Sequence, residues 1–241
     1  MTHTPQVDII AGARPNFMKI APIIKEMDRR RARDSSLRYR LIHTGQHYDP
    51  RMSGEFFAQL GIPEPDENLG VGSGSHAQQT AAIMTRYEDL LERQRSELCL
   101  VVGDVNSTMA CSITAKKAGI PVAHVEAGIR SGDWSMPEEV NRVVTDAITD
   151  WNFTTSDFAN KNLLASGVPK EKIFFVGNTM IDTLVSNIER LCPPDFVGTL
   201  GLEKGRYLVV TLHRPSNVDA PQHLFKVLIA LSESARGLPI V

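Results

Sequence analysis

The chain has 241 residues, of which 42% are hydrophobic and 22% are charged, a composition typical of a folded globular protein rather than a disordered one. Its 26 Lys and Arg residues against 28 Asp and Glu residues leave a formal net charge of -2, which argues against a nucleic-acid partner. No run approaches the roughly 18 apolar residues of a membrane span, and the N-terminus lacks a signal-peptide pattern. We therefore expect a cytoplasmic protein with no membrane partner.

Short apolar runs alternate with amphipathic stretches through residues 1–191. The apolar runs predict six strands, at 7–11, 39–44, 98–102, 121–125, 151–154 and 173–176. Helices are predicted at about 15–30, 52–60, 107–118, 137–149, 157–165 and 179–191, with another that Ser75 caps. Residues 61–74, rich in Gly and Pro, predict a long surface loop. Apolar strands separated by helices are typical of an α/β fold with a doubly wound parallel sheet, so we expect a Rossmann-like N-terminal domain at 1–191.

A change of composition separates this domain from the rest of the chain. Residues 192–205 contain two prolines and three glycines with few helix signals, which predicts a linker. A strand at 207–212, a helix at 222–232 and a strand at 238–241 follow. A β-α-β unit that closes on its last residue cannot cover both faces of its strands. We therefore expect residues 206–241 to be the start of a truncated second Rossmann-like domain.

Three cysteines, Cys99, Cys111 and Cys192, are scattered singly along the chain. They form no C-x-x-C pair and no ligand spacing with histidine, so we expect reduced thiols and no metal. The chain also lacks the patterns G-x-G-x-x-G and G-x-x-x-x-G-K-[ST], which argues against a nicotinamide cofactor and a P-loop.

Charged side chains follow four of the predicted strands directly. Arg14 follows the first strand, Asp104 and Glu126 follow two central ones, and His213 follows the strand after the linker. Because the carboxyl ends of parallel strands share one edge of a sheet, ligands bind in the crevice there. The sequence therefore predicts that these groups gather on one side of the fold.

Each of these residues also has a purely structural interpretation. Arg14 can bind an anion at the start of a helix or be a surface charge, and Lys19 can contact a ligand or only solvent. Asp104 can be catalytic or cap the following helix, whereas Glu126, behind an apolar strand, is expected to be partly buried with a partner or a task. His124 is interpreted as a core histidine whose hydrogen bonds are satisfied.

The helix opened by Pro137 carries an acid and a base at i,i+4 spacing. Glu138 and Arg142 are predicted to face away from Val140, Val144 and Ala147. Taken alone, they read as an exposed ion pair, which contributes only about 0.3–0.5 kcal/mol.

Several motifs occur in a characteristic order. They are GARPN at 12–16, TGQH at 44–47, HVEAGIRSGD at 124–133, PEEVNR at 137–142, GNT at 177–179 and TLHR at 211–214. With them, essentially the whole chain resembles the non-hydrolysing UDP-N-acetylglucosamine 2-epimerases. Asn16 differs from this pattern, because many members have Glu there.

The resemblance implies two Rossmann-like domains in a GT-B-type arrangement and a homodimer that binds UDP-GlcNAc and UDP. It implies interconversion of UDP-GlcNAc and UDP-ManNAc for surface polysaccharides, by anti elimination of UDP to 2-acetamidoglucal and re-addition, without metal or redox cofactor. Two alternatives stay open: a hydrolysing epimerase that releases ManNAc and UDP, and a non-catalytic, truncated dimerising half.

The resemblance also implies a role for particular residues. Those implied to be catalytic are Asp104, Glu126, Glu138 and His213. Those implied to bind substrate are Arg14, Lys19 and Arg142. Gln46 and His47 match positions that bind a second, activating UDP-GlcNAc in bacterial members.

Overall fold

The computed structural model describes residues 6–33, 37–45, 57–212 and 218–241. The chain forms two compact units, Met1–Asn187 and Ile188–Val241. Among the described residues, no helix is long and apolar enough to cross a membrane.

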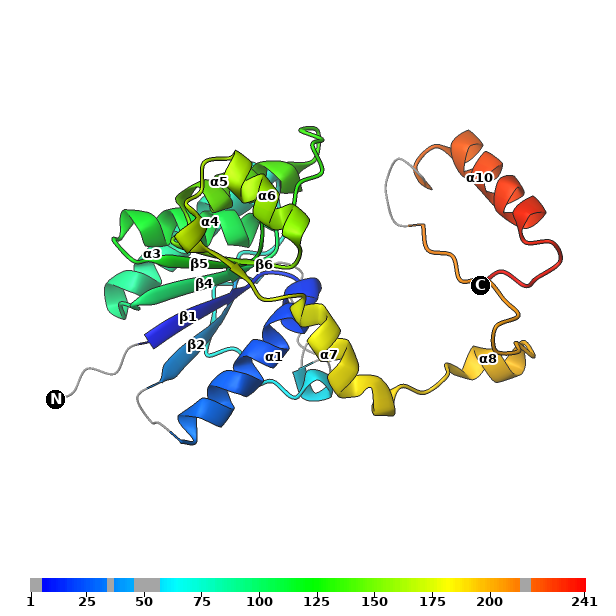
Figure 1. The fold of residues 1–241 in the computed structure, drawn as a ribbon, viewed down its shortest axis with the longest axis horizontal. Coiled ribbons are helices and arrows are strands. Elements are labelled where there is room, and N and C mark those ends of the chain that lie inside the picture. The colour runs from blue at the N-terminus through cyan, green and yellow to red at the C-terminus, as the bar shows by residue number, and fades with distance from the viewer. Residues whose placement is uncertain (1–5, 34–36, 46–56, 213–217) are drawn as a thin grey trace. The chain divides into compact units, whose positions relative to one another are not determined.

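The first unit is built on a seven-stranded sheet with the order β3-β2-β1-β4-β5-β6-β7 (Figure 1). The strands are β1 (Gln6–Ala11), β2 (Arg38–His43), β3 (Glu67–Asn68), β4 (Leu98–Val102), β5 (Val122–Ala127), β6 (Trp151–Thr154) and β7 (Ile173–Phe175). Every pair of neighbours is parallel, which confirms the predicted α/β fold. The prediction missed β3, a two-residue edge strand inside the expected 61–74 loop, because so short a strand has no periodicity to read.

Helices cover both faces of this sheet. They are α1 (Arg14–Arg31), α3 (His76–Arg93), α4 (Asn106–Lys117), α5 (Pro137–Ile148), α6 (Asp157–Ala165), the 3-10 helix η1 (Lys170–Lys172) and α7 (Thr179–Asn187). Helices α1 and α7 lie on one face, and α3, α4 and α5 lie on the other (Figure 1). Residues 57–60 are also helical.

Two hydrophobic clusters fill the space between the layers. Phe17, Ile20 and Ile24 of α1 pack on one face of the sheet. Tyr87 of α3 and Cys111 of α4 pack on the other. Burial raises the pKa of the Cys111 thiol well above its usual value, which agrees with an inert core thiol.

Local signals explain where two of these helices begin. Ser75 caps α3 as predicted, because its hydroxyl accepts from the N–H of Gln78 while the Gln78 side chain accepts from the N–H of Ser75. Pro15 lies in the first turn of α1, where its fixed φ suits a helix and its missing N–H has no intrahelical partner to lose.

The second unit contains the 3-10 helix η2 (Ile188–Arg190), α8 (Asp195–Thr199) and α10 (Pro221–Ser234). The helix predicted to reach 191 therefore ends its α-helical part at Asn187, and a short helix lies inside the predicted linker. The strands predicted at 207–212 and 238–241 meet only in a single parallel bridge between Leu208 and Ile240. Two strands without further neighbours have little to stabilise them, which explains the short pairing.

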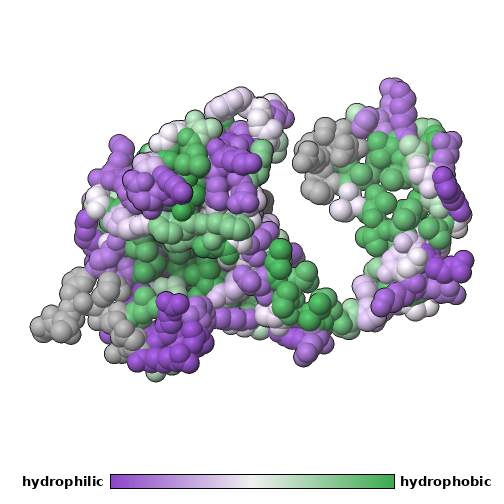
Figure 2. Space-filling view, viewed as in Figure 1, coloured by the Kyte–Doolittle hydropathy of each residue, from purple (hydrophilic) through white to green (hydrophobic). Residues whose placement is uncertain are grey.

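Helix α7 exposes apolar side chains along its length (Figure 2). Its opposite side packs on α1, where the hydroxyl of Thr183 donates to the Met18 carbonyl at 2.6 Å. Ile181, Leu184 and Val185 stay more than half exposed.

Candidate functional site

The polar residues lie at the point where the strand order of the sheet reverses. Strand β1 lies beside β4, and the connections from these two strands lead to opposite sides of the sheet. In doubly wound folds, the crevice at this switch point is the usual ligand site. Arg14 opens α1 just after β1, Asp104 lies in the loop after β4, and Glu126 is near the end of β5 itself, so the structure brings these three predicted residues to one edge of the sheet.

The β1 loop is closely packed against its neighbours. The hydroxyls of Thr44 and Ser107 lie 2.7 Å apart, directly over Gly12. A Cβ atom at Gly12 would lie 2.2 Å from the Ser107 oxygen, so only glycine fits. Because Ser107 is in the first turn of α4, its hydrogen bond to Thr44 joins α4 to the segment after β2, and both side chains pack on Gly12 after β1.

The Asn16 side chain accepts hydrogen bonds from two backbone N–H groups that we expected to be available to an anion. Its side-chain oxygen accepts from the N–H groups of Gly12 at 3.0 Å and Ala13 at 2.9 Å, while its amide donates to the Val102 carbonyl. The start of α1 therefore uses part of its hydrogen-bonding capacity internally. Arg14 beside it is exposed and interacts with its surroundings.

A β-bulge in β5 interrupts the alternation of side chains between the two faces of the sheet at Glu126. Val125 pairs with Phe153 and Ala127 with Thr154, so Glu126 is the extra residue of the bulge. Its φ of 74° lies in the left-handed region, which is uncommon for a residue with a side chain. The bulge turns the Glu126 carboxylate toward α1, where it forms an ion pair with Lys19. Strained residues of this kind concentrate at functional sites.

Gly103 lies between the two acidic loops. Its φ is 67°, and a Cβ atom there would come within 2.8 Å of the Lys19 ammonium and 3.5 Å of the Glu126 carboxylate. The positive φ favours glycine at this turn, and the missing side chain leaves room for the Lys19–Glu126 ion pair.

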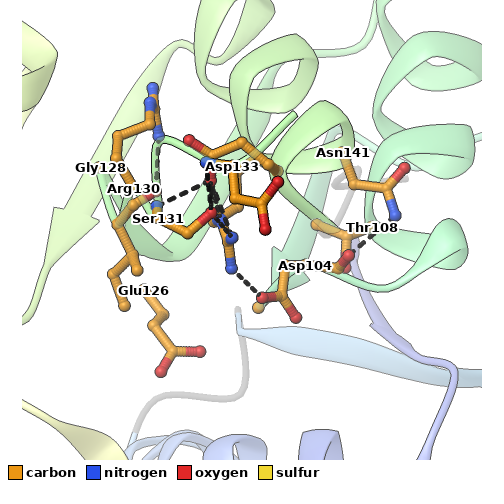
Figure 3. Close-up of polar contacts among 12 residues, drawn as sticks. Asp104, Thr108, Glu126, Gly128, Arg130, Ser131, Asp133 and Asn141 are labelled. Carbon is orange, nitrogen blue, oxygen red and sulfur yellow. Dashed lines mark hydrogen bonds and ion pairs between the residues drawn. The ribbon is translucent and has the colours of Figure 1, made fainter. Parts of the chain in front are cut away.

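Asp104 is held by a cation from another element. Arg142 of α5 donates to its carboxylate at 2.6 Å, and the amide of Asn141 donates to its carbonyl at 2.8 Å (Figure 3). The N-cap of α4 is Val105 and has no side-chain capping bond, so the capping interpretation of Asp104 is wrong. The Asp104 carboxylate stays one-third exposed and accessible to a ligand.

The partner predicted for Arg142 was wrong. Its guanidinium is nine-tenths buried and binds Glu139 at 2.8 Å rather than Glu138. The Glu139 carboxylate also accepts from the N–H groups of Ser131 at 2.9 Å and Gly132 at 3.0 Å. Burial opposes the charge, but these hydrogen bonds and Arg142 outweigh it and lower the pKa of Glu139 to about 2.

Helix α5 buries its polar face and exposes much of its apolar one. The buried residues are Glu139, Asn141, Arg142, Thr145 and Asp146. Val140 and Ala147 are exposed, which reverses the expected orientation. Loop backbone after β4 and β5 turns toward α5 and needs acceptors and donors there, and the polar stripe supplies them.

The remaining predicted site residues are placed as follows. Glu138 is half-buried in the first turn of α5, and its carboxylate forms no hydrogen bond or ion pair with any residue that the structure describes. His213, Gln46 and His47 lie outside the described residues. Within the part of the chain that is described, no three His, Cys, Asp or Glu side chains gather to hold a metal ion.

The sequence reasoning missed Glu139, Asn141 and Asp146. Each of them binds loop backbone beside the acids. A signal was present, because Glu139, Arg142 and Asp146 recur at i, i+3 and i+7 and form a polar stripe on one side of a helix.

Comparison with known proteins shows the family of the chain. Residues 29–241 match the model of the family described as UDP-N-acetylglucosamine 2-epimerase. The chain belongs to this family. A UDP-N-acetylglucosamine 2-epimerase homolog of Methanococcus maripaludis is 41% identical over 93% of this chain and 62% of its own length. The UDP-2,3-diacetamido-2,3-dideoxy-D-glucuronate 2-epimerase of Pseudomonas aeruginosa is 38% identical over the same shares.

A solved structure shows the same fold in a member of the family. It is the Methanocaldococcus jannaschii UDP-GlcNAc 2-epimerase in complex with UDP-GlcNAc and UDP. It is 36% identical with a TM-score of 0.83, and the match covers 98% of this chain and 64% of that chain. This chain thus spans about 62% of the length of the curated relatives that it matches.

Proposed function

We propose that the protein is a UDP-N-acetylglucosamine 2-epimerase that interconverts UDP-GlcNAc and UDP-ManNAc. One observation carries the proposal: two carboxylates at the carboxyl ends of the adjacent strands β4 and β5, Asp104 and Glu126, each held by its own cation near the switch point of the sheet. The M. jannaschii relative with UDP-GlcNAc and UDP bound supports the nucleotide sugar as ligand.

The chemistry explains why carboxylates and cations are needed together. The proton on C2 has no neighbouring carbonyl to acidify it, so its direct removal is very costly. If the C1–O bond breaks first and UDP leaves with the bonding electrons, positive charge develops on the sugar and the C2 proton becomes removable. The product is 2-acetamidoglucal with a C1–C2 double bond. Protonation of C2 on the other face and return of a UDP oxygen to C1 complete the inversion.

We assign the residues of this chain to these steps by their position. Asp104 and Glu126 are the acids that move the C2 proton or stabilise the cationic sugar. Lys19 and Arg142 hold these carboxylates in place, and we assign Arg14, at the exposed start of α1, to the diphosphate of the substrate. Glu138 and His213 complete the catalytic set, and Gln46 and His47 the activator site, as the family resemblance implies.

The organisation of the whole protein is part of this proposal. We assign residues 1–191 to the N-terminal Rossmann-like domain, 192–205 to a linker and 206–241 to the start of the second domain. A homodimer in the cytoplasm that supplies ManNAc for surface polysaccharides follows from the resemblance. Light scattering during gel filtration measures the oligomeric state, and a monomer across the micromolar range contradicts the homodimer.

A second substrate is favoured by one relative. The P. aeruginosa 2-epimerase, 38% identical, is named for a UDP-linked 2,3-diacetamido glucuronate. The same elimination and re-addition invert C2 of that sugar, since both substrates share the C2 acetamido group and the UDP leaving group. Assaying both nucleotide sugars in parallel decides between them by kcat/KM.

The decisive experiment follows products by proton NMR in D2O. UDP-GlcNAc incubated with the chain, or with the chain joined to the C-terminal part of the M. maripaludis relative, is expected to give UDP-ManNAc with deuterium at C2. Free ManNAc accumulating with UDP favours the hydrolysing epimerase instead. A folded protein of either form without turnover, and without UDP binding by calorimetry, favours the non-catalytic dimerising half and contradicts the proposal.

A further inference from the structure

Two glutamates follow Pro137 in the first turn of α5, and their surroundings differ. Glu138 is half-buried and forms no hydrogen bond or ion pair with any residue that the structure describes. Glu139 is 2% exposed, and its carboxylate accepts hydrogen bonds from two backbone N–H groups, a hydroxyl and a guanidinium. A buried carboxylate with this many donors is held in one orientation, so its partners show what it fixes in place.

The first partner of Glu139 is the guanidinium of Arg142. Its Nε and Nη2 donate to one carboxylate oxygen of Glu139 at 3.0 and 2.8 Å, while its Nη1 donates to Asp104 at 2.6 Å. A guanidinium is planar and rigid, so holding two of its nitrogens sets the direction of the third. Glu139 therefore determines where Arg142 points, and Arg142 in turn holds Asp104.

The second partner is the loop that follows β5. The oxygen that binds Arg142 also accepts from the N–H of Ser131 at 2.9 Å and from its hydroxyl at 3.1 Å. The other oxygen accepts from the N–H of Gly132 at 3.0 Å. Glu126 lies in the bulge just before this loop. One carboxylate thus contacts both the arginine that holds Asp104 and the loop that follows Glu126.

A second acid of α5 holds the same loop nearer its start. Asp146 accepts from the Gly128 N–H at 3.1 Å and lies 2.7 Å from the buried ring of His124. His124 has satisfied hydrogen bonds, as the sequence predicted, because its other ring nitrogen lies 2.8 Å from the Gly103 carbonyl. Helix α5 therefore holds the start of the loop through Asp146 and its later part through Glu139.

An amide cannot replace the Glu139 carboxylate in these contacts. The hydrogen bonds and Arg142 lower the pKa of Glu139 to about 2 despite its burial, so the group is a carboxylate at neutral pH. Both of its oxygens accept from donors. A glutamine accepts through one atom only and turns an NH2 group toward either Gly132 or Arg142, which are themselves donors.

We propose that Glu139 is a positioning residue, which directs Arg142 toward Asp104 and fixes the loop after Glu126 against the same helix. The proposal rests on the proposed function for the identity of the reaction, whereas the contact of Glu139 with Arg142 exists without any substrate. Glu139 acts through its partners and does not touch the sugar, because its carboxylate is buried by them.

Hydrogen exchange of the Arg142 Nε–H tests the contact without a reaction. This NMR signal, assigned by its loss in Arg142→Lys, is expected to exchange slowly in the unmodified chain because Nε is buried and bonded to Glu139. In Glu139→Gln we expect exchange at least about 10-fold faster. Unchanged exchange overturns the proposal. If circular dichroism shows that Glu139→Gln does not fold, Glu139→Asp, which keeps the charge but shortens the side chain, takes its place in every measurement.

Turnover tests the positioning role. Glu139→Gln is expected to lower kcat for UDP-GlcNAc by about 10²-fold with KM nearly unchanged, because a misplaced acid affects the chemical step more than binding. Asp8→Asn is the matched control. Asp8 is also a buried acid that binds a buried arginine, Arg40, and its hydrogen bonds with described residues do not reach the loops after β4 and β5. Equal losses of kcat in the two variants would reduce Glu139 to a stabilising residue and overturn the proposal.

A double variant tests whether Glu139 acts through Arg142. Arg142→Lys removes the rigid fork that Glu139 holds. If the two residues act together, the loss of kcat in Glu139→Gln/Arg142→Lys is expected to be at least about 10-fold smaller than the product of the two single losses. A fully multiplicative loss overturns the route through Arg142.

The outcomes separate this proposal from the proposed function. Full kcat in Glu139→Gln overturns the positioning role even if exchange at Arg142 is faster. Faster exchange at Arg142 in a protein that never turns over UDP-GlcNAc contradicts the proposed function instead, and leaves the contact between Glu139 and Arg142 established.

Discussion

At the residue scale, the unusual backbone angle φ of Glu126 supports its assignment to the site. A glutamate with φ of 74° costs stability, and the surroundings must hold it there. Val125 and Ala127 keep their pairing with β6 on either side, and Lys19 holds the carboxylate. This arrangement holds the acid beside Lys19 and Gly103 at a cost to the stability of the fold.

Replacing this acid by its isosteric amide tests the assignment. Glu126→Gln is expected to lower turnover of UDP-GlcNAc by 10² to 10⁴-fold, since an amide cannot exchange a proton, while circular dichroism stays unchanged. Glu203→Gln, at an exposed site in the second unit, serves as the control. Near-normal turnover in Glu126→Gln refutes the role of this residue.

Glu139 predicts a pH dependence of stability. Its pKa in the folded chain is about 2, below the ordinary value of 4.5, so the folded state favours the ionised form. The stabilisation is complete above about pH 4.5 and is lost as the pH falls toward 2, because the unfolded chain binds the proton more readily there. The melting temperature should fall over this window, and less steeply in Glu139→Gln. Parallel melting curves for the two proteins are inconsistent with this coupling.

At the element scale, a buried ion pair joins the neighbouring strands β1 and β2. Arg40 donates to both oxygens of Asp8 at 2.8 Å, and Tyr87 of α3 donates to the same carboxylate at 3.0 Å. Both charged side chains are almost fully buried. Such a pair gives strand register more than net stability, because desolvation offsets much of the attraction.

Breaking this pair on one side is expected to be costly. Arg40→Met leaves the Asp8 carboxylate buried without its cation and should lower the free energy of unfolding by about 3–5 kcal/mol in urea. Arg29→Met removes the same type of side chain from an exposed pair with Glu26, where we expect a much smaller loss because solvent screens the attraction. Similar losses in the two variants would show that Asp8 finds another partner.

Helix α5 marks the limit of pattern-based reasoning at this scale. Its bounds were predicted within one residue, because Pro137 and the following polar and apolar periodicity are local signals. Its orientation was wrong, because apolar residues were expected inward. The orientation of α5 is set by the loops after β4 and β5, whose backbone groups form hydrogen bonds with Glu139 and Asn141.

At the scale of the whole molecule, the chain divides after Asn187 into units that each form their own contacts. Exposed basic residues lie soon after this division and around the proposed linker at 192–205, including Arg190, Lys204 and Arg206. Connections with few contacts are the usual sites of proteolysis.

Limited trypsin digestion tests the proposed linker. Cleavage is expected first after Arg190, Lys204 or Arg206, leaving a folded fragment that starts at the N-terminus and ends near residue 190. Lys116 and Lys117, at the end of α4, are expected to stay uncut because a helix must unfold to enter a protease. Mass spectrometry identifies the order of cuts, and early cleavage within α4 contradicts the division.

The amino-acid sequence by itself determined the alternation of strands and helices, the parallel sheet and the loops that carry the acids. These follow from local periodicity and from the rule that parallel strands end at one edge. Tertiary structure alone decided that Glu126 turns toward Lys19, that Arg142 pairs with Glu139 and Asp104, and that His124 lies between Asp146 and Gly103. The physical reason is that each of these depends on a partner remote along the chain or on a backbone angle imposed by neighbouring strands, and neither leaves a local signal.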